Sequence, residues 1–167
     1  MFLTRKEILA EIKKGNIKIE PFDRKALGPI SFDLSLGDEF GLLKKKGIKL
    51  DEEVNYKEHI KIVRSKEIEL KPNDFVLGIT RERITLAENI AGLLSGRSKF
   101  ARLGLLVHAT APLIHPGVSN KQIFEIKNVG NAKLILSAGL RIGQLSFIRL
   151  SGKEKYSGIF SKQEKIK

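Results

Sequence analysis

Alternating apolar and polar residues dominate this chain after its first fifteen positions. The stretches "NIKIEPF", "ISFDLSL", "HIKIV" and "KQIFEIKN" follow a period of two, which is typical of β-strands that bury one face. "KEIELKPNDFVLGIT" predicts two strands separated at Pro72 and Asn73, and "AKLILSAGLRIGQLSFIRL" closes the series with a turn at "SAG". Many short strands with frequent turns predict an all-β sandwich, jelly roll or barrel.

Two segments depart from this alternation and predict helices. Near the start, Thr4 and Glu7 form a capping box before an apolar stripe at helical spacing, and Gly15 ends the segment. In the centre, "SKFARL" lacks strand alternation, which predicts a short helix around 97–103. The predicted fold is therefore all-β, with one short N-terminal helix and one short central helix.

The chain of 167 residues is long enough to bury one sizeable core, and no repeat or linker divides it. We expect a single domain over residues 1–167, in which the polar, Lys-rich segment 151–167 forms a flexible tail. No apolar run reaches the roughly eighteen residues of a membrane span, and the first residues lack the apolar centre of a signal peptide. These features favour a cytoplasmic protein without a membrane partner.

The net charge of +12 favours an anionic partner, such as phosphate groups, nucleic acid or a membrane surface. The alternative is a solvated charged surface, since Lys and Glu richness with little Met, Gln and Cys is typical of thermophiles. The two dense basic runs, "LLKKKGIKL" and "KQEKIK", contain no aromatic residues for base stacking. Nucleic acid is therefore not the expected partner.

Metal chemistry is restricted by the absence of cysteine and the spacing of the three histidines. Disulfides, thiolate catalysis and zinc sites built on Cys pairs are excluded. The histidines form neither HxxxH nor HExxH, which disfavours a zinc enzyme. Any metal would be a hard cation held by oxygen atoms, such as Mg²⁺.

Glu125 is a candidate catalytic residue because it lies in the apolar stretch "QIFEIKN". A carboxylate in an interior strand is costly unless it is paired or functional. The alternative is a surface glutamate on the solvated face of an edge strand, and the spacing favours neither.

A cationic turn, "SGRSKFAR", precedes the apolar run that carries His108 and His115. Arg97 and Lys99 can hold phosphate oxygens, and a helix start at Ser98 offers backbone N–H groups to the same anion. The alternative is a helix N-cap with surface charge. Arg102 lies between apolar residues and needs a buried partner, for which Glu125 is the candidate. Single histidines after apolar runs are more often structural than catalytic.

Together these segments resemble the dCTP deaminase branch of the dUTPase superfamily. "GRSKFARLGLLVHATAPLIHPG", "FEIKNVGN" and "SAGLRIGQLSF" occur in the family's order and spacing. "SFDLSLGDEF" is similar to the family's N-terminal motif, and "KYSG" at 155–158 is similar to its phosphate-closing tail. The resemblance spans about residues 1–158. It implies a distorted jelly roll, the dUTPase-like β-clip, assembled as a homotrimer with active sites between subunits.

The resemblance implies deamination of dCTP to dUTP and ammonia, without zinc and with Mg²⁺ accompanying the triphosphate. Glu125 would take a proton from the water that attacks C4 of cytosine. Ser98 and the backbone carbonyl of Ala111 would orient that water, and Arg102 would fix and polarise the set. The nucleotide would be bound by Arg97, Ser98, Lys99, His115, Gln144, Lys155 and Tyr156.

Three positions depart from the family pattern. His115 stands where the family has an aspartate that bonds the sugar 3′-hydroxyl and, in dUTPases, supports the attacking water. Asn120 replaces a glycine, and Lys99 replaces a second serine. The alternatives are a dUTP diphosphatase, a bifunctional enzyme and a non-catalytic nucleotide-binding homologue. "VHATA" favours the deaminase, and we expect His115 to weaken nucleotide binding and to make diphosphate release slow or absent.

Overall fold

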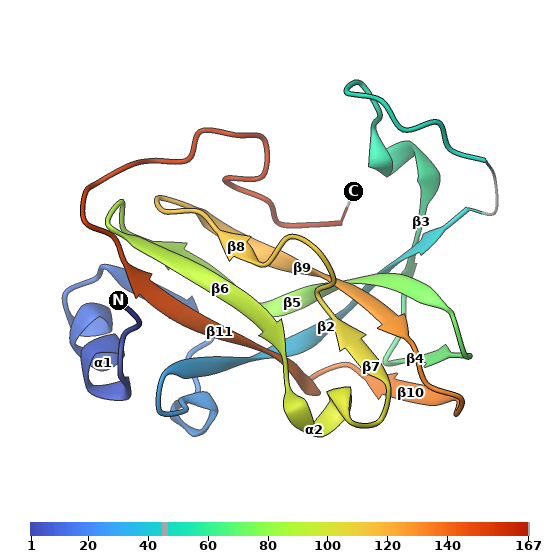
Figure 1. The fold of residues 1–167 in the computed structure, drawn as a ribbon, viewed down its shortest axis with the longest axis horizontal. Coiled ribbons are helices and arrows are strands. Elements are labelled where there is room, and N and C mark those ends of the chain that lie inside the picture. Colours follow the sequence, from blue (N-terminus) through green and yellow to red (C-terminus); the bar gives the residue numbers. More distant parts are fainter. Residues whose placement is uncertain (45–46, 167) are drawn as a thin grey trace.

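The computed structural model describes residues 1–44 and 47–166. Both predicted helices form: α1 spans Arg5–Lys13 and α2 spans Ser98–Ala101, and short 3₁₀ turns cover Arg24–Ala26 and Tyr56–His59. The capping box before α1 is present, because the Glu7 carboxylate accepts hydrogen bonds from the Thr4 N–H and hydroxyl at 2.8 and 2.7 Å. Helix α1 lies at the end of the molecule that also holds the N-terminus (Figure 1).

The strands account for most of the described chain. They are β1 (Ile17–Glu20), β2 (Ser31–Leu43), β3 (Ile60–Arg64), β4 (Glu67–Leu70), β5 (Phe75–Leu86), β6 (Ile90–Gly96), β7 (Leu105–Val107), β8 (Leu113–Ile114), β9 (Ser119–Asn128), β10 (Leu134–Ser137) and β11 (Arg141–Arg149). The strands predicted from alternation are confirmed. Strands β6, β7 and β8 were not predicted, because their apolar runs do not alternate with polar residues.

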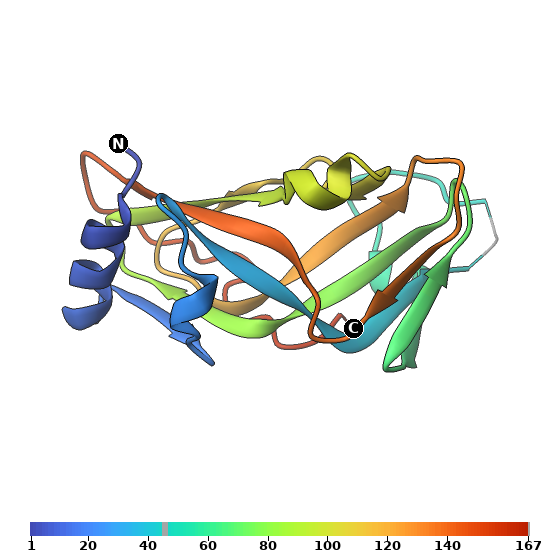
Figure 2. The ribbon, with the colours of Figure 1, turned by 90° about the horizontal axis from the view of Figure 1, so that it is seen from below.

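Among the described residues, nine strands form one antiparallel sheet. Its order is β7-β9-β5-β2-β11-β6-β8, with β1 added to β5 and β3 added to β2, while β4 and β10 pair separately. The register shifts within β2, β5 and β11, between Leu36 and Phe40, Ile79 and Arg83, and Arg141 and Gly143. Such bulges increase the local twist, and the sheet curls on itself (Figure 2).

The core lies inside the curl and is built on four fully buried phenylalanines with aliphatic side chains around them: Phe32, Phe40, Phe124 and Phe147. The side chains of β9 alternate between the two faces of the sheet, and this alternation decides which of them point into the core. Phe124 and Ile126 are buried, whereas Glu125 between them faces the other side of the sheet and is half-buried. At Gly143 a Cβ would lie 2.5 Å from the Phe124 ring, so this glycine permits close packing.

The C-terminal segment runs back over β8 and β9 (Figure 1). The carbonyls of Ser161 and Gln163 accept hydrogen bonds from the amides of Ser119 and Lys121 at 3.0 and 2.8 Å, along an edge of β9. The structure therefore gives this segment, hereafter the tail (residues 151–166), a defined course. The flexibility expected for residues 151–167 stays a prediction, and residue 167 lies outside the described residues.

Ile166 anchors the tail in a small apolar cluster with Ile60, Leu77 and Ile79. Its side chain is fully buried. Its N–H donates to Glu39 Oε1 at 2.9 Å, and its carbonyl accepts from the Tyr56 hydroxyl at 2.9 Å.

Replacing Ile166 with aspartate should release the tail, because a carboxylate is costly in this apolar cluster. The backbone amides of Ser119 and Lys121 would then lose their acceptors, and their hydrogen exchange should accelerate by about fivefold or more. Exchange measured by NMR or mass spectrometry checks this. The matched control is Ile159→Asp, because Ile159 is 88% exposed in the same tail. Unchanged exchange at both amides in Ile166→Asp would show that Ile166 does not hold the tail.

Glu11 joins α1 to β11 through a buried carboxylate. It accepts hydrogen bonds from the Asn16 side chain at 2.7 Å and Lys14 Nζ at 3.0 Å, and it pairs with Arg149 at 3.1 Å. These contacts, that of Asn16 foremost, outweigh burial and lower the pKa of Glu11 from 4.5 to about 2. Because the folded-state pKa is lowered, the resulting stability is fully present above about pH 4.5 and is lost as the pH falls towards 2.

Glu11→Gln should therefore lower the free energy of unfolding at pH 7 by roughly 1–3 kcal/mol. The difference from the unaltered protein should shrink as the pH falls from 4.5 towards 2. Urea unfolding at a series of pH values measures both effects. Glu52→Gln, at an exposed position, serves as the control. A difference that stays constant across this pH range would contradict the ion cluster as the cause.

Candidate active site

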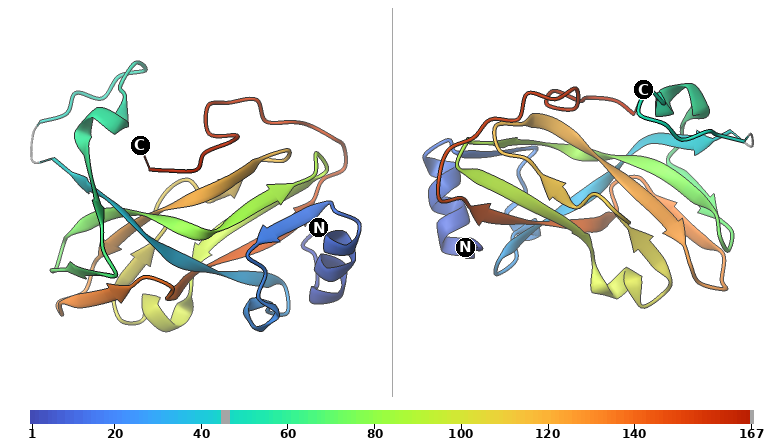
Figure 3. Two further views of the ribbon diagram at one scale, coloured as in Figure 1. Left: turned by 180° about the vertical axis from the view of Figure 1, so that it is seen from behind. Right: turned by 45° about the horizontal axis from the view of Figure 1, so that its top comes forward.

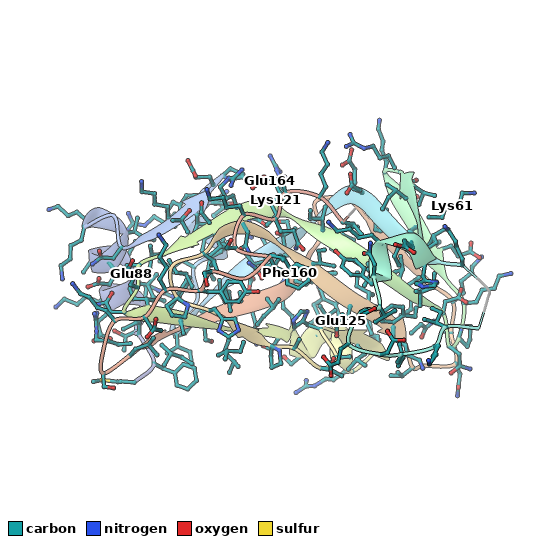
Figure 4. All side chains as sticks on the ribbon, turned by 90° about the horizontal axis from the view of Figure 1, so that it is seen from above. Lys61, Glu88, Lys121, Glu125, Phe160 and Glu164 are labelled. Atoms are coloured by element: carbon teal, nitrogen blue, oxygen red, sulfur yellow. The ribbon has the colours of Figure 1, made fainter. Side chains whose placement is uncertain are left out.

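A cavity of about 870 Å³ lies on the face of β9 that points away from the core. Three parts of the chain line it, namely β9, the segment 108–115 and the tail, which contribute among others Ile123, Glu125, His108, Ala111, His115, Tyr156, Phe160 and Gln163. Leu43, Leu50 and Tyr56 border its far end. Figure 4 shows Glu125 and Phe160 on the same face of the molecule, over which the tail runs.

Glu125 is the carboxylate on the floor of this cavity. Its Oε2 accepts hydrogen bonds from the Thr110 backbone N–H at 3.1 Å and from the Thr110 hydroxyl at 3.3 Å. Its backbone carbonyl accepts from the His108 N–H at 2.8 Å. Strand β9 lies between β5 and β7, so the interior-strand interpretation is confirmed and the edge-strand alternative is wrong. The half-buried carboxylate is satisfied by Thr110 without a cationic partner among the described residues.

His108 shapes the wall next to Glu125. It is a non-glycine residue with a positive φ of 63°, a backbone conformation that is enriched at functional sites. Its Nε2 lies 2.6 Å from the carbonyl oxygen of Ala111, so this nitrogen carries the hydrogen and donates it. Its Nδ1 is buried and has no hydrogen-bond partner among the described residues. His108 therefore fixes the direction of the Ala111 carbonyl, a structural role.

His115 lies at the opposite wall, in contact with the tail. Its ring stacks on the Tyr156 ring, with 4.7 Å between the centroids and 10° between the planes. The Tyr156 N–H donates to the Pro116 carbonyl at 3.0 Å, and Lys155 packs over Gly117. The structure thus brings together three of the predicted nucleotide-binding residues, His115, Lys155 and Tyr156, at the turn "HPG".

Asn120 and Gln122 are functional candidates of the same wall that the sequence did not single out for this role. Asn120 Nδ2 donates to the Phe160 carbonyl at 2.6 Å, and Gln122 Nε2 donates to Asn120 Oδ1 at 2.6 Å. Asn120 therefore holds the tail, and Gln122 orients the Asn120 side chain. No signal in the sequence could locate this contact, since it joins segments 40 residues apart.

A second polar group, hereafter the α2 cluster, consists of Asp33, Ser95, Arg97, Arg141 and Gln144. Arg97 pairs with Asp33 at 3.0 Å and donates to the Arg141 carbonyl at 2.9 Å, while Gln144 donates to the Ser95 hydroxyl at 3.2 Å. Burial raises the pKa of Asp33 above its usual value, and the positive charges of Arg97 and Arg141 oppose that shift. Asp33 lies within β2.

Ser98, Lys99 and Arg102 lie beside this cluster, on or directly after α2, and all three are exposed. No ion pair joins Arg102 to Glu125 of the same chain among the described residues, so the expected pairing stays a prediction for an assembly of several copies. The physical reason is that α2 is a single turn, which ends at Arg102 and leaves the neighbouring Leu103 63% exposed. In a single copy of the chain the Arg102 side chain is therefore exposed to water.

The predicted site residues thus form two groups. Glu125, Ala111, His115 and Tyr156 line the cavity with Lys155 beside them, whereas none of residues 97–102 lines it. Helix α2 and the tail lie at opposite edges of the molecule in Figures 1 and 3. A single copy of the chain therefore presents the acid–base candidate and the cationic turn separately.

The described residues contain no group of three or more His, Asp or Glu side chains placed to hold a metal ion. In the same part of the chain, no helix is long and apolar enough to cross a membrane.

Comparisons with known proteins identify relatives of this chain. The family model described as dCTP deaminase-like matches residues 2–150. A protein of Mycolicibacterium vanbaalenii named "dCTP deaminase, dUMP-forming" is 39% identical over 155 residues, which is 90% of this chain and 82% of the relative. A protein of Clavibacter michiganensis with the same name is 38% identical over 159 residues, 93% of this chain and 79% of the relative.

Two solved structures share the fold. The 2′-deoxycytidine 5′-triphosphate deaminase from Agrobacterium tumefaciens has a TM-score of 0.69 at 18% identity; the match covers 87% of this chain but only 47% of that one. A mutant dUTPase from phage phi11 of S. aureus has a TM-score of 0.54 at 12% identity, over 86% of this chain and 96% of that one. The predicted all-β, dUTPase-like architecture is therefore confirmed. By sequence, the chain belongs to the dCTP deaminase-like family.

Proposed function

We propose that this protein deaminates dCTP by hydrolysis at C4 of the cytosine ring. The observation that carries the proposal is Glu125, a half-buried carboxylate on the floor of a largely apolar cavity, with one oxygen held by Thr110. A carboxylate in such a site suits acid–base catalysis. Family membership and the names of the curated relatives support the same reaction.

In the proposed reaction, Glu125 takes a proton from a water molecule whose oxygen attacks C4. The proton passes to N3, and the new hydroxyl group on C4 gives its proton through Glu125 to the amino group. The C4–N4 bond then breaks and ammonia leaves, so that one water is consumed and dCTP becomes dUTP. The Ala111 carbonyl, held by His108, and the Ser98 hydroxyl would orient the water. Arg102 would fix and polarise the water and these groups.

Ser98 and Arg102 can take these roles only if they come from another copy of the chain. None of residues 97–102 lines the cavity that holds Glu125, and α2 and the tail, which does line it, lie at opposite edges of the molecule (Figure 3). We therefore propose the homotrimer that the resemblance implies, with α2 of one copy facing the cavity of the next. Its cationic turn would bind the triphosphate through Arg97, Ser98 and Lys99, together with Gln144, Lys155 and Tyr156.

Magnesium is proposed as part of the substrate. A nucleotide triphosphate holds Mg²⁺ through its own oxygens and through water, so that the ion needs few protein ligands. The described residues fit this arrangement, because the α2 cluster offers the single carboxylate of Asp33, which already pairs with Arg97. We assign the ion no protein ligand. The nucleotide substrate also favours a cytoplasmic location.

The final product is the second part of the proposal. The two curated relatives carry the name "dUMP-forming", which favours release of diphosphate after deamination. His115, however, stands where the resemblance expects an aspartate that supports this step in dUTPases. We propose that the protein forms dUMP from dCTP and that diphosphate release is the slower of the two steps.

Glu125→Gln tests the first step. The amide keeps the size of the side chain but cannot take up a proton, so ammonia release should fall by roughly a hundredfold or more. Binding of dCTP, followed by calorimetry, should survive because other residues hold the ring and phosphates. Deamination at the normal rate would leave Glu125 a structural carboxylate. Lack of ammonia release from dCTP by the unaltered protein would favour the non-catalytic or dUTPase alternatives.

His115→Asp tests the second step. A carboxylate accepts a charge-assisted hydrogen bond from the sugar hydroxyl, which should tighten dCTP binding by roughly ten- to a hundredfold. A single time course that follows ammonia and pyrophosphate separately should show ammonia appearing first in the unaltered protein. The delay should shorten in His115→Asp. Equal rates of ammonia and pyrophosphate release in both proteins would contradict the role given to residue 115.

A further inference from the structure

We infer that Thr110 is a positioning residue that restricts proton transfer to one oxygen of Glu125. The inference rests on the proposed deamination and deepens it, because it assigns the proton-carrying atom. Thr110 gives both of its donors, the backbone N–H and the hydroxyl, to Oε2 of Glu125, at 3.1 and 3.3 Å. Oε1 accepts no hydrogen bond from the described residues. The two oxygens of the carboxylate are therefore not equivalent.

The segment that carries Thr110 is anchored to β9 at its start and closed by a hydrogen bond within it, so Thr110 acts on Glu125 from a defined position. At one end, the His108 N–H donates to the Glu125 backbone carbonyl at 2.8 Å. Within the segment, His108 Nε2 donates to the Ala111 carbonyl at 2.6 Å and closes a short loop around Thr110. The positive φ of His108, 63°, is the backbone conformation that turns the chain into this loop.

The chemistry follows from where a proton can bind. A carboxylate oxygen has two lone pairs, and Oε2 already accepts two hydrogen bonds, both from Thr110. A proton on Oε2 would displace one of these hydrogen bonds, whereas a proton on Oε1 leaves both intact. The protonated form of Glu125 therefore carries its hydrogen on Oε1. The deamination needs one group to carry a proton from water to N3 and a second proton from the C4 hydroxyl to the amino group. A fixed oxygen performs these four transfers without rotation of the carboxyl group.

The test compares two substitutions that differ in one donor. Thr110→Val keeps the shape and the backbone N–H but removes the hydroxyl, while Thr110→Ser retains it. With dCTP as substrate and ammonia as readout, Thr110→Val should lower kcat on the order of tenfold, the low end of the range for a hydrogen bond to a charged group. KM should change by less than about twofold, since Thr110 is not assigned a contact to the nucleotide. Thr110→Ser should retain kcat within about threefold.

A double-mutant cycle separates positioning from a merely structural role. If Thr110 acts through Glu125, adding Thr110→Val to Glu125→Gln should cause little further loss of kcat. Multiplicative losses, a normal kcat in Thr110→Val, or equal losses in Thr110→Val and Thr110→Ser would each overturn the inference. If Thr110→Val turns over normally while Glu125→Gln is impaired, the positioning role of Thr110 is wrong but the proposed deamination stands. An unaltered protein that releases no ammonia would remove the proposed function and the inference with it.

Discussion

Strand β9 buries Phe124 and Ile126 in the core, and this burial turns the residue between them to the opposite face of the sheet. Because a shift by one residue would exchange the two faces, the core fixes the direction of Glu125 more firmly than any polar contact at the site. Pairing with β5 on one side and with β7 on the other prevents such a shift. The apolar core therefore positions the chemistry, and Thr110 only completes an orientation that the register has set.

The elements around the cavity could be predicted to different extents. The period of two located β9 and therefore Glu125, and the capping box located α1, since both signals are local in sequence. Strands β6 to β8 carry continuous apolar runs, in which the period is lost. Asp33 and Arg97 are 64 positions apart and meet only because β2 and β6 both pair with β11. Such contacts depend on the strand order, which no local pattern encodes.

The exposure of Arg102 in the single chain could not be predicted for a similar reason. In the sequence it lies between Phe100, Ala101 and Leu103, and apolar neighbours suggest burial. In the structure these residues belong to a single helical turn at the edge of the sheet, where one turn has too few neighbours to bury all of its faces. Sequence neighbours predict burial well within a strand of a packed sheet, but poorly in a short helical turn. Glu125 lies in such a strand, whereas Arg102 directly follows a short helical turn.

Two of the three departures from the family pattern acquire a shared physical meaning in the structure. His115 stacks on Tyr156, and Asn120 donates to the Phe160 carbonyl, so both replacements contact the tail. An aspartate at 115 would have no ring to stack on Tyr156. A glycine at 120 would have no side-chain amide to donate to the Phe160 carbonyl. The same two positions that weaken the resemblance to the sugar-binding turn thus strengthen the contact between the chain and its own tail. In this protein, residues 115–120 therefore bind the tail that runs over the cavity, in addition to lining the cavity itself.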